Sequence, residues 1–259
     1  MSVRPDLDEL RAVAQPYDVM ARVSGEHWAG KVYMRHVSIR LTRMLVPTPV
    51  TPDGLTWGML VAGLAAALVL TVPHWWAALL TVLLVQLQLL FDCSDGELAR
   101  WRRRTGASGI YIDRLGHYVT DAGLAIAVGV RTDGGLGSID GWTTVGLVAG
   151  VLVLLVKAET DLVHVARAGA GLPRVVDDAG TATPRMSLVR RVRRMVVRVP
   201  FYRALLALEL SLLALVAAVV DAAASTDLAT KVLAVSLPVI GVIVVAGHLL
   251  GVLTSGRLR

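Results

Sequence analysis

Six long apolar runs dominate this sequence and restrict the folds that it can adopt. Each is close to the ~20 residues that an α-helix needs to cross a bilayer. The runs lie at Leu55–Val72, Trp75–Arg100, Ala107–Val130, Trp142–Val165, Phe201–Ala222 and Leu228–Thr254. Hydrophobic residues make up 55% of the 259 positions and the mean hydropathy is +0.63, too apolar for an ordinary soluble domain. We therefore predict an all-α integral membrane protein, a bundle of six transmembrane helices.

Basic residues are concentrated in every second connection between these runs. The residues before the first run, the link at 100–104 and the stretch 167–198 are rich in arginine, whereas the alternate connections are poor in basic residues. Because basic connections tend to stay in the cytoplasm, we predict cytoplasmic termini and an active site that faces the cytoplasm. We expect a multi-pass protein of the plasma membrane, with Trp75, Trp76 and Trp142 at the opposite interface.

The polar regions divide the chain into three parts. Residues 1–30 lack the basic and apolar segments of a signal peptide, so we expect an uncleaved cytoplasmic segment. Residues 31–53 hold a basic amphipathic helix at Lys31–Leu45 and a proline-rich linker, and residues 54–259 form the membrane domain. A second basic amphipathic helix is predicted at residues 187–199. We attribute the net charge of +6 to contacts with anionic lipid headgroups and nucleotide phosphates, and we expect no nucleic-acid partner.

Several charged residues lie where the second and third runs meet. Side chains three or four positions apart share a helix face, so Asp92 and Asp95 are neighbours on one helix, and Asp113 and His117 on the next. A short basic link lets the two helices run antiparallel with their acidic faces together. Charges are costly in a bilayer, so simple salt bridges with nearby arginines explain them less well than a ligand does. Facing carboxylates suit a hard divalent cation, Mg²⁺ or Mn²⁺, which also binds substrate phosphates.

This segment resembles the signature of the CDP-alcohol phosphotransferase family. The residues that carry the resemblance are Asp92, Asp95, Gly96, Ala99, Arg100, Gly109 and Asp113. A weaker match is the segment Thr51–Thr56, with Asp53 where the family usually has Asn. The sequence departs from the pattern at His117, which stands in place of a fourth aspartate. Members of this family are integral membrane enzymes that move a phosphate-linked alcohol from a CDP carrier to an acceptor hydroxyl and release CMP.

The resemblance implies a polar cavity that holds a metal and both substrates. The implied ligands of Mg²⁺ or Mn²⁺ are Asp92, Asp95, Asp113 and His117. The implied contacts of the CDP donor, a CDP-diacylglycerol or a CDP-polyol, are Asp92, Gly96, Ala99, Arg100 and Gly109. The segment Asp-Gly-Glu-Leu-Ala-Arg looks more like that of family members that use inositol phosphate or other polyol phosphates, so the resemblance favours such an acceptor. The resemblance is also compatible with a homodimer.

His117 and Asp113 are the candidate catalytic residues. His117 lies one helical turn after Asp113, and a neutral imidazole is well suited to act as a general base near neutral pH. We predict that it accepts the proton of the acceptor hydroxyl, with Asp121 fixing its tautomer. The alternatives are that His117 only binds metal, with a preference for Mn²⁺ or Zn²⁺, or that the site has lost activity.

Further charges in the later runs are candidates for contacts with the acceptor. Lys157 and Asp161 share one face of the fourth run, and Arg203 lies near the start of the fifth. They could bind the phosphate and hydroxyls of the acceptor, or they could form ion pairs that only stabilise the fold. Two other functions stay open: an inactive relative that binds a CDP-lipid, and a transporter of ions or solutes. Metal-dependent release of CMP would distinguish an enzyme from both.

Overall fold

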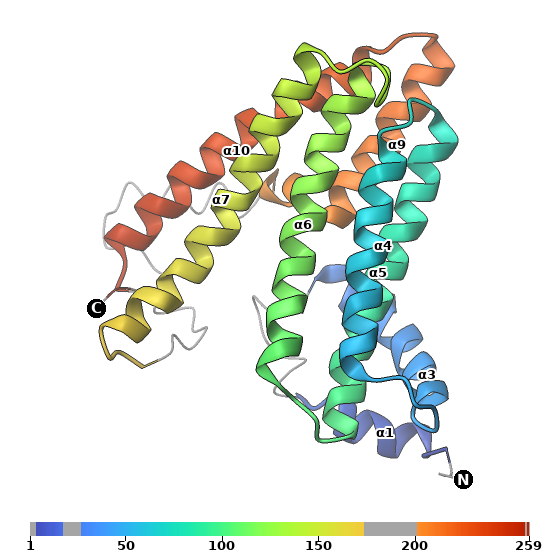
Figure 1. The fold of residues 1–259 in the computed structure, drawn as a ribbon, viewed down its shortest axis with the longest axis vertical. Coiled ribbons are helices and arrows are strands. Elements are labelled where there is room, and N and C mark those ends of the chain that lie inside the picture. Colours follow the sequence, from blue (N-terminus) through green and yellow to red (C-terminus); the bar gives the residue numbers. More distant parts are fainter. Residues whose placement is uncertain (1–3, 18–26, 174–200, 257, 259) are drawn as a thin grey trace. The chain divides into compact units, whose positions relative to one another are not determined.

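The computed structural model describes residues 4–17, 27–173, 201–256 and 258, and the regular structure of these residues is helical (Figure 1). The elements are α1 (Leu7–Ala14), the π-helix η1 (Gly30–Met34), α3 (Arg35–Leu45), α4 (Pro52–Leu70), α5 (Trp75–Trp101), α6 (Ala107–Thr132), α7 (Gly141–Gly169), the 3₁₀ helix η2 (Phe201–Leu205), α9 (Ala207–Ala224) and α10 (Leu228–Thr254). They form two compact units. Unit 1 is Met1–Ala66 with Thr81–Thr120, and unit 2 is Ala67–Leu80 with Asp121–Arg259.

Six long helices occupy the six predicted runs. Five of them are long and apolar enough to cross a membrane, in agreement with an all-α membrane protein: α4, α5, α7, α9 and α10. The predicted count of six spans is not confirmed, because α6 is not among these five helices; it carries Asp113, Arg114, Asp121 and Arg131. The fifth run also starts later than predicted. Phe201–Leu205 is a separate 3₁₀ helix and Leu206 is extended, so α9 begins at Ala207.

In unit 1 the predicted basic helix is present as η1 followed by α3. The side of α3 that includes Ser38, Ile39 and Thr42 is buried, whereas Val37 and Met44 are exposed. Ile39 packs with Leu10 and Ala14 of α1 in a small core at the end of α5. The predicted second basic helix, at residues 187–199, lies outside the described residues.

Small residues let the helices approach closely, as is common between membrane helices. In unit 1, a Cβ on Gly63 of α4 would collide with Thr120 of α6. In unit 2, a Cβ on Gly129 of α6 would lie 2.8 Å from the Cα of Gly146 in α7. Further along, α7 packs beside α10 (Figure 1), where Gly241 leaves room for Leu152.

Two turns of unit 2 are closed in the same way, by an aspartate that binds the start of the next helix. Asp133, after α6, accepts hydrogen bonds from the backbone N–H groups of Asp140, Trp142 and Thr143 and from the Thr143 hydroxyl. Asp221 of α9 does the same for α10, where its donors include the backbone N–H and the hydroxyl of Thr230. Each carboxylate satisfies N–H groups that a helix start leaves without a partner.

Candidate active site

The end of α5 and the start of α6 border a cavity of about 280 Å³ in unit 1. The start of α4 and the link between α5 and α6 complete its walls. All seven residues of the sequence motif line this cavity: Asp92, Asp95, Gly96, Ala99, Arg100, Gly109 and Asp113. Residues from two helices that are joined by a short link therefore gather around one space, as the antiparallel arrangement requires.

Asp92, Asp113 and His117 form a compact cluster at this site. Nε2 of His117 lies 3.5 Å from Oδ1 of Asp92 and 3.6 Å from Oδ1 of Asp113. One ligand atom from each of the three residues lies within 4.8 Å of the others, so one cation could reach all three. Their side chains are partly exposed, which leaves them accessible to a ligand. Two carboxylates and an imidazole are a donor set that accepts Mn²⁺ or Zn²⁺ as well as Mg²⁺.

Asp95 lines the same cavity but is not a member of this cluster. Its Oδ2 accepts a hydrogen bond of 2.6 Å from the hydroxyl of Thr56, a buried residue of α4. Thr56 ends the weaker sequence match at the start of the first run, and sequence reasoning gave it no role. The structure shows that it orients a motif carboxylate from a third helix.

The side chain of Arg100 folds back along α5. A Cβ on Gly96 would lie 3.1 Å from Nη1 of Arg100, so this glycine makes room for the guanidinium. Nε of Arg100 donates a hydrogen bond of 2.5 Å to the backbone carbonyl of Ala14, at the end of α1. Across the cavity, Gly109 plays a similar part for Asp53, whose Oδ1 would lie 3.3 Å from an added Cβ.

Glu97 is a buried residue of the motif helix that sequence reasoning missed. Its side chain is fully buried and accepts hydrogen bonds from Gln15 at 2.7 Å, Ser38 at 2.6 Å and Thr42 at 2.7 Å. Nη1 of Arg35 lies 3.4 Å away. This single carboxylate therefore ties α5 to α3 and to the residue after α1. The available sequence signal was a charge beside Asp95 in an apolar helix, but its partners are distant in sequence.

The candidate acceptor residues lie in unit 2, where two of them have acidic partners. Nζ of Lys157 lies 2.5 Å from Oδ2 of Asp121, and Nη1 of Arg203 lies 3.8 Å from Oε1 of Glu209. Asp161 lies one turn beyond Lys157 in α7. These ion pairs agree with the alternative that the charged residues only stabilise the fold. Their contact with the acceptor remains a prediction.

The partners of Asp121 also bear on the proposed tautomer of His117. Oδ1 of Asp121 accepts a hydrogen bond of 2.8 Å from the backbone N–H of Ala207, and its Oδ2 pairs with Lys157. Asp121 is thus a buried residue that joins α7 and the start of α9 within unit 2. Both of its oxygens have these partners, so its contacts give no support to a role in fixing the imidazole.

These features define a helical membrane protein with an Asp-Asp-His cluster beside a cavity that the motif residues line. No family model matches the chain, and no curated protein matches it either. Among solved structures, the chain is similar to the crystal structure of phosphatidylinositol phosphate synthase PgsA1 of Mycobacterium tuberculosis in its apo form. The TM-score is 0.51 and the identity 22%, and the match covers 85% of this chain and 98% of that chain. At this identity the likeness shows that the two proteins share a fold.

Proposed function

We propose that this protein is a metal-dependent CDP-alcohol phosphotransferase. The observation that carries the proposal is the gathering of the whole motif around one cavity, with Asp92, Asp113 and His117 close enough to share a cation. The reaction joins an acceptor oxygen to the phosphorus of the CDP-linked donor and breaks the bond from that phosphorus to CMP. The acceptor hydroxyl loses its proton. The fold shared with a phosphatidylinositol phosphate synthase agrees with this chemistry.

The donor set of the cluster fits one divalent cation. Two carboxylate oxygens and Nε2 of His117 would hold it, and the partial exposure of the three side chains leaves positions open for substrate oxygens. When bound, such a cation neutralises charge on the phosphoryl oxygens. Asp95, which Thr56 holds apart from the cluster, would contact a second ion or the donor.

The geometry favours metal binding over general-base catalysis as the role of His117. Its Nε2 is the atom that faces Asp92 and Asp113, so the nitrogen that would accept a proton is also the one placed to bind metal. In this arrangement a carboxylate is left to accept the proton of the acceptor, and Asp113 is suited to it because its side chain is 37% exposed. We therefore propose His117 as a metal ligand and Asp113 as both ligand and proton acceptor.

The remaining motif residues would bind the CDP donor. The small side chain of Ala99 lets a diphosphate approach α5. Gly96 makes room for the guanidinium of Arg100, whose donors match phosphate oxygens. Nε of Arg100 donates a hydrogen bond to the carbonyl of Ala14, whereas Nη1 and Nη2 lie beside Gly96, which also lines the cavity. We propose a polyol phosphate or inositol phosphate as the acceptor, in line with the activity named for the similar structure.

The direct test is release of CMP by the purified full chain. CDP-diacylglycerol would be incubated with inositol phosphate or other alcohol phosphates, with Mg²⁺, with Mn²⁺ or with a chelator. We expect metal-dependent release, reduced by more than about 100-fold in Asp92→Asn and Asp113→Asn because each removes a proposed ligand. Asp8→Asn, an exposed acidic residue of α1, is the matched control and should retain full activity.

Three outcomes would reject parts of this proposal. Full activity in the presence of a chelator would exclude the metal. Binding of CDP-diacylglycerol without release of CMP would identify an inactive relative. Uptake of metal into sealed vesicles without CMP release would instead identify a transporter. The role of His117 is decided by Mn²⁺ affinity in His117→Ala, which should fall sharply for a ligand and change little for a general base.

A further inference from the structure

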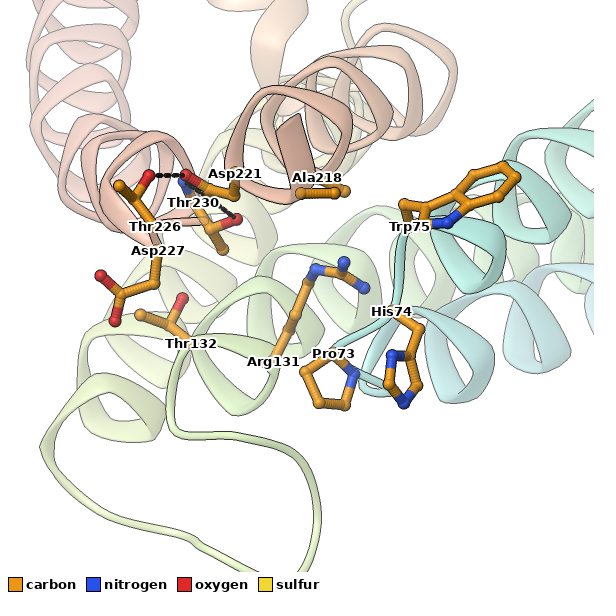
Figure 2. A pocket seen from close by; sticks show the side chains of 11 residues that line it. Pro73, His74, Trp75, Arg131, Thr132, Ala218, Asp221, Thr226, Asp227 and Thr230 are labelled. Carbon is orange, nitrogen blue, oxygen red and sulfur yellow. Dashed lines mark hydrogen bonds between the residues drawn. The ribbon is translucent and has the colours of Figure 1, made fainter. Parts of the chain in front are cut away.

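A second cavity of about 280 Å³ lies in unit 2 and contains none of the motif residues. Its walls are the turn between α4 and α5, the end of α6 and the turn between α9 and α10 (Figure 2). We propose that this cavity binds a phosphate group, with Arg131 as its main contact and His74 as a second donor.

Arg131 carries the positive charge of the cavity. Its side chain is 7% exposed, and Nη1 donates hydrogen bonds to the backbone carbonyls of Leu70 and Val72 at the end of α4. Figure 2 shows the side chain of Arg131 reaching toward Ala218 and Trp75, which also line the cavity. A guanidinium has five N–H donors in a planar fork that matches phosphate oxygens. The donors that α4 leaves unused point to a ligand.

A different arginine shows what a purely structural role looks like. Arg102 follows α5 and donates to the backbone carbonyls of Leu45, Val46, Thr48 and Val50, through both Nη1 and Nη2. The N–H donors on both Nη atoms of Arg102 therefore bond to the end of α3 and to the linker after it. In contrast, the hydrogen bonds of Arg131 in the described part of the chain involve Nη1 alone.

The two acidic residues of the cavity already have other partners. Asp221 accepts hydrogen bonds from Thr226, Ala229 and Thr230 at the start of α10. Asp227 pairs with Lys231 at 2.7 Å. Asp221 attracts the guanidinium of Arg131 electrostatically, but within the described residues neither carboxylate forms an ion pair or a hydrogen bond with it, so direct contact does not neutralise the buried charge. A buried charge of this kind is costly unless an anion neutralises it.

The residues beside the cavity indicate that it lies at the level of the lipid headgroups, where phosphates are available. Trp75 and Trp76, at the start of α5, are 51% and 49% exposed, and tryptophans of membrane proteins gather at the level of the lipid headgroups. The His74 ring stacks on Trp76, with centroids 6.1 Å apart, beside the cavity. The ligand is therefore a phosphate oxyanion, supplied either by a lipid headgroup or as free phosphate.

The experiment compares soluble short-chain lipids on the purified full chain in neutral detergent. Dioctanoyl phosphatidic acid carries a phosphate, and dioctanoylglycerol has the same acyl chains without it. Isothermal titration should show binding of the first, and binding at least tenfold weaker in Arg131→Gln. Competition by inorganic phosphate would identify free phosphate as a source, whereas its failure to compete would assign the site to a lipid headgroup.

Two further variants complete the test, one as a control for charge and one that fills the cavity. Arg11→Gln removes one positive charge from an exposed position of α1 that is not part of the lining, so the affinity of this variant should stay within twofold of that of the unmodified chain. Ala218→Leu fills the cavity and leaves the hydrogen bonds of Arg131 in place, so it should weaken binding even if Arg131→Gln does not fold. Equal binding of the two lipids, or unchanged binding in Ala218→Leu, would overturn the proposal.

Discussion

Replacing Glu97 with alanine should strongly destabilise unit 1. The side chains of Ser38 and Thr42 are fully buried, and each would lose the carboxylate oxygen to which its hydroxyl donates. A buried donor without a partner costs ~1–3 kcal/mol, so the two together cost about 2–6 kcal/mol. Gln15 and Arg35 also lose a charged acceptor, but they are less buried. We expect the free energy of unfolding to fall by about 3–6 kcal/mol.

The assay is unfolding of the detergent-solubilised protein with increasing denaturing detergent, followed by tryptophan fluorescence. Trp101 packs against the small core of α1 and α3, so it reports on the region that Glu97 holds together. Glu9→Ala, an exposed acidic residue of α1, is the control and should change the free energy by less than about 0.5 kcal/mol.

A combined variant tests the reasoning behind the number. When both partners of a buried hydrogen bond become apolar, the net cost is small. Glu97→Leu with Ser38→Ala and Thr42→Val should therefore be more stable than Glu97→Leu alone. If Glu97→Ala costs less than about 1 kcal/mol, or if the combined variant is the less stable of the two, then Glu97 does not join these segments as we argue.

Two other predictions concern unit 2. Desolvation raises the pKa of Asp133, but hydrogen bonds from Thr143, Asp140 and Trp142 together hold it below its ordinary value. The stability that this carboxylate adds is complete above its unfolded pKa of about 3.9 and is lost as the pH falls through its lower folded pKa. Unfolding curves from pH 6 downward should therefore show less loss in Asp133→Asn, and parallel losses would contradict this. Lys157→Ala should lower the melting temperature without a selective rise in the acceptor KM, because it leaves buried Asp121 unpaired; a selective rise in KM would restore the acceptor role.

The sequence predicted the features that depend on length and local spacing. Apolar runs of bilayer length located the long helices to within a few residues, except at the start of α9. Spacing of four placed His117 beside Asp113, and the short link brought Asp92 to them. Spacing of three did not bring Asp95 into the cluster. Positions three apart on a helix differ in direction by about 60°, so Asp95 and Asp92 do not point the same way. Asp95 instead accepts a hydrogen bond from Thr56 of α4.

The contacts that sequence patterns could not supply are those between distant segments. The partners of Glu97 and Arg100 include Gln15 and Ala14, more than 80 positions away in the chain, and depend on how a short helix packs. The same holds for Lys157, since a lysine that faces a carboxylate and one that faces a substrate have the same sequence pattern.

The two aspartate-closed turns affect how the protein can sit in membranes of different thickness. A helix start normally depends on water for its free N–H groups, and this keeps it at the polar surface. The first amides of α7 and α10 are bonded to Asp133 and Asp221 instead. The charged aspartates keep both turns at the polar surface, because a carboxylate is costly in hydrocarbon. Hydrophobic mismatch at these helix starts would then be relieved by tilting of the helices, and not by movement of the turns into the bilayer.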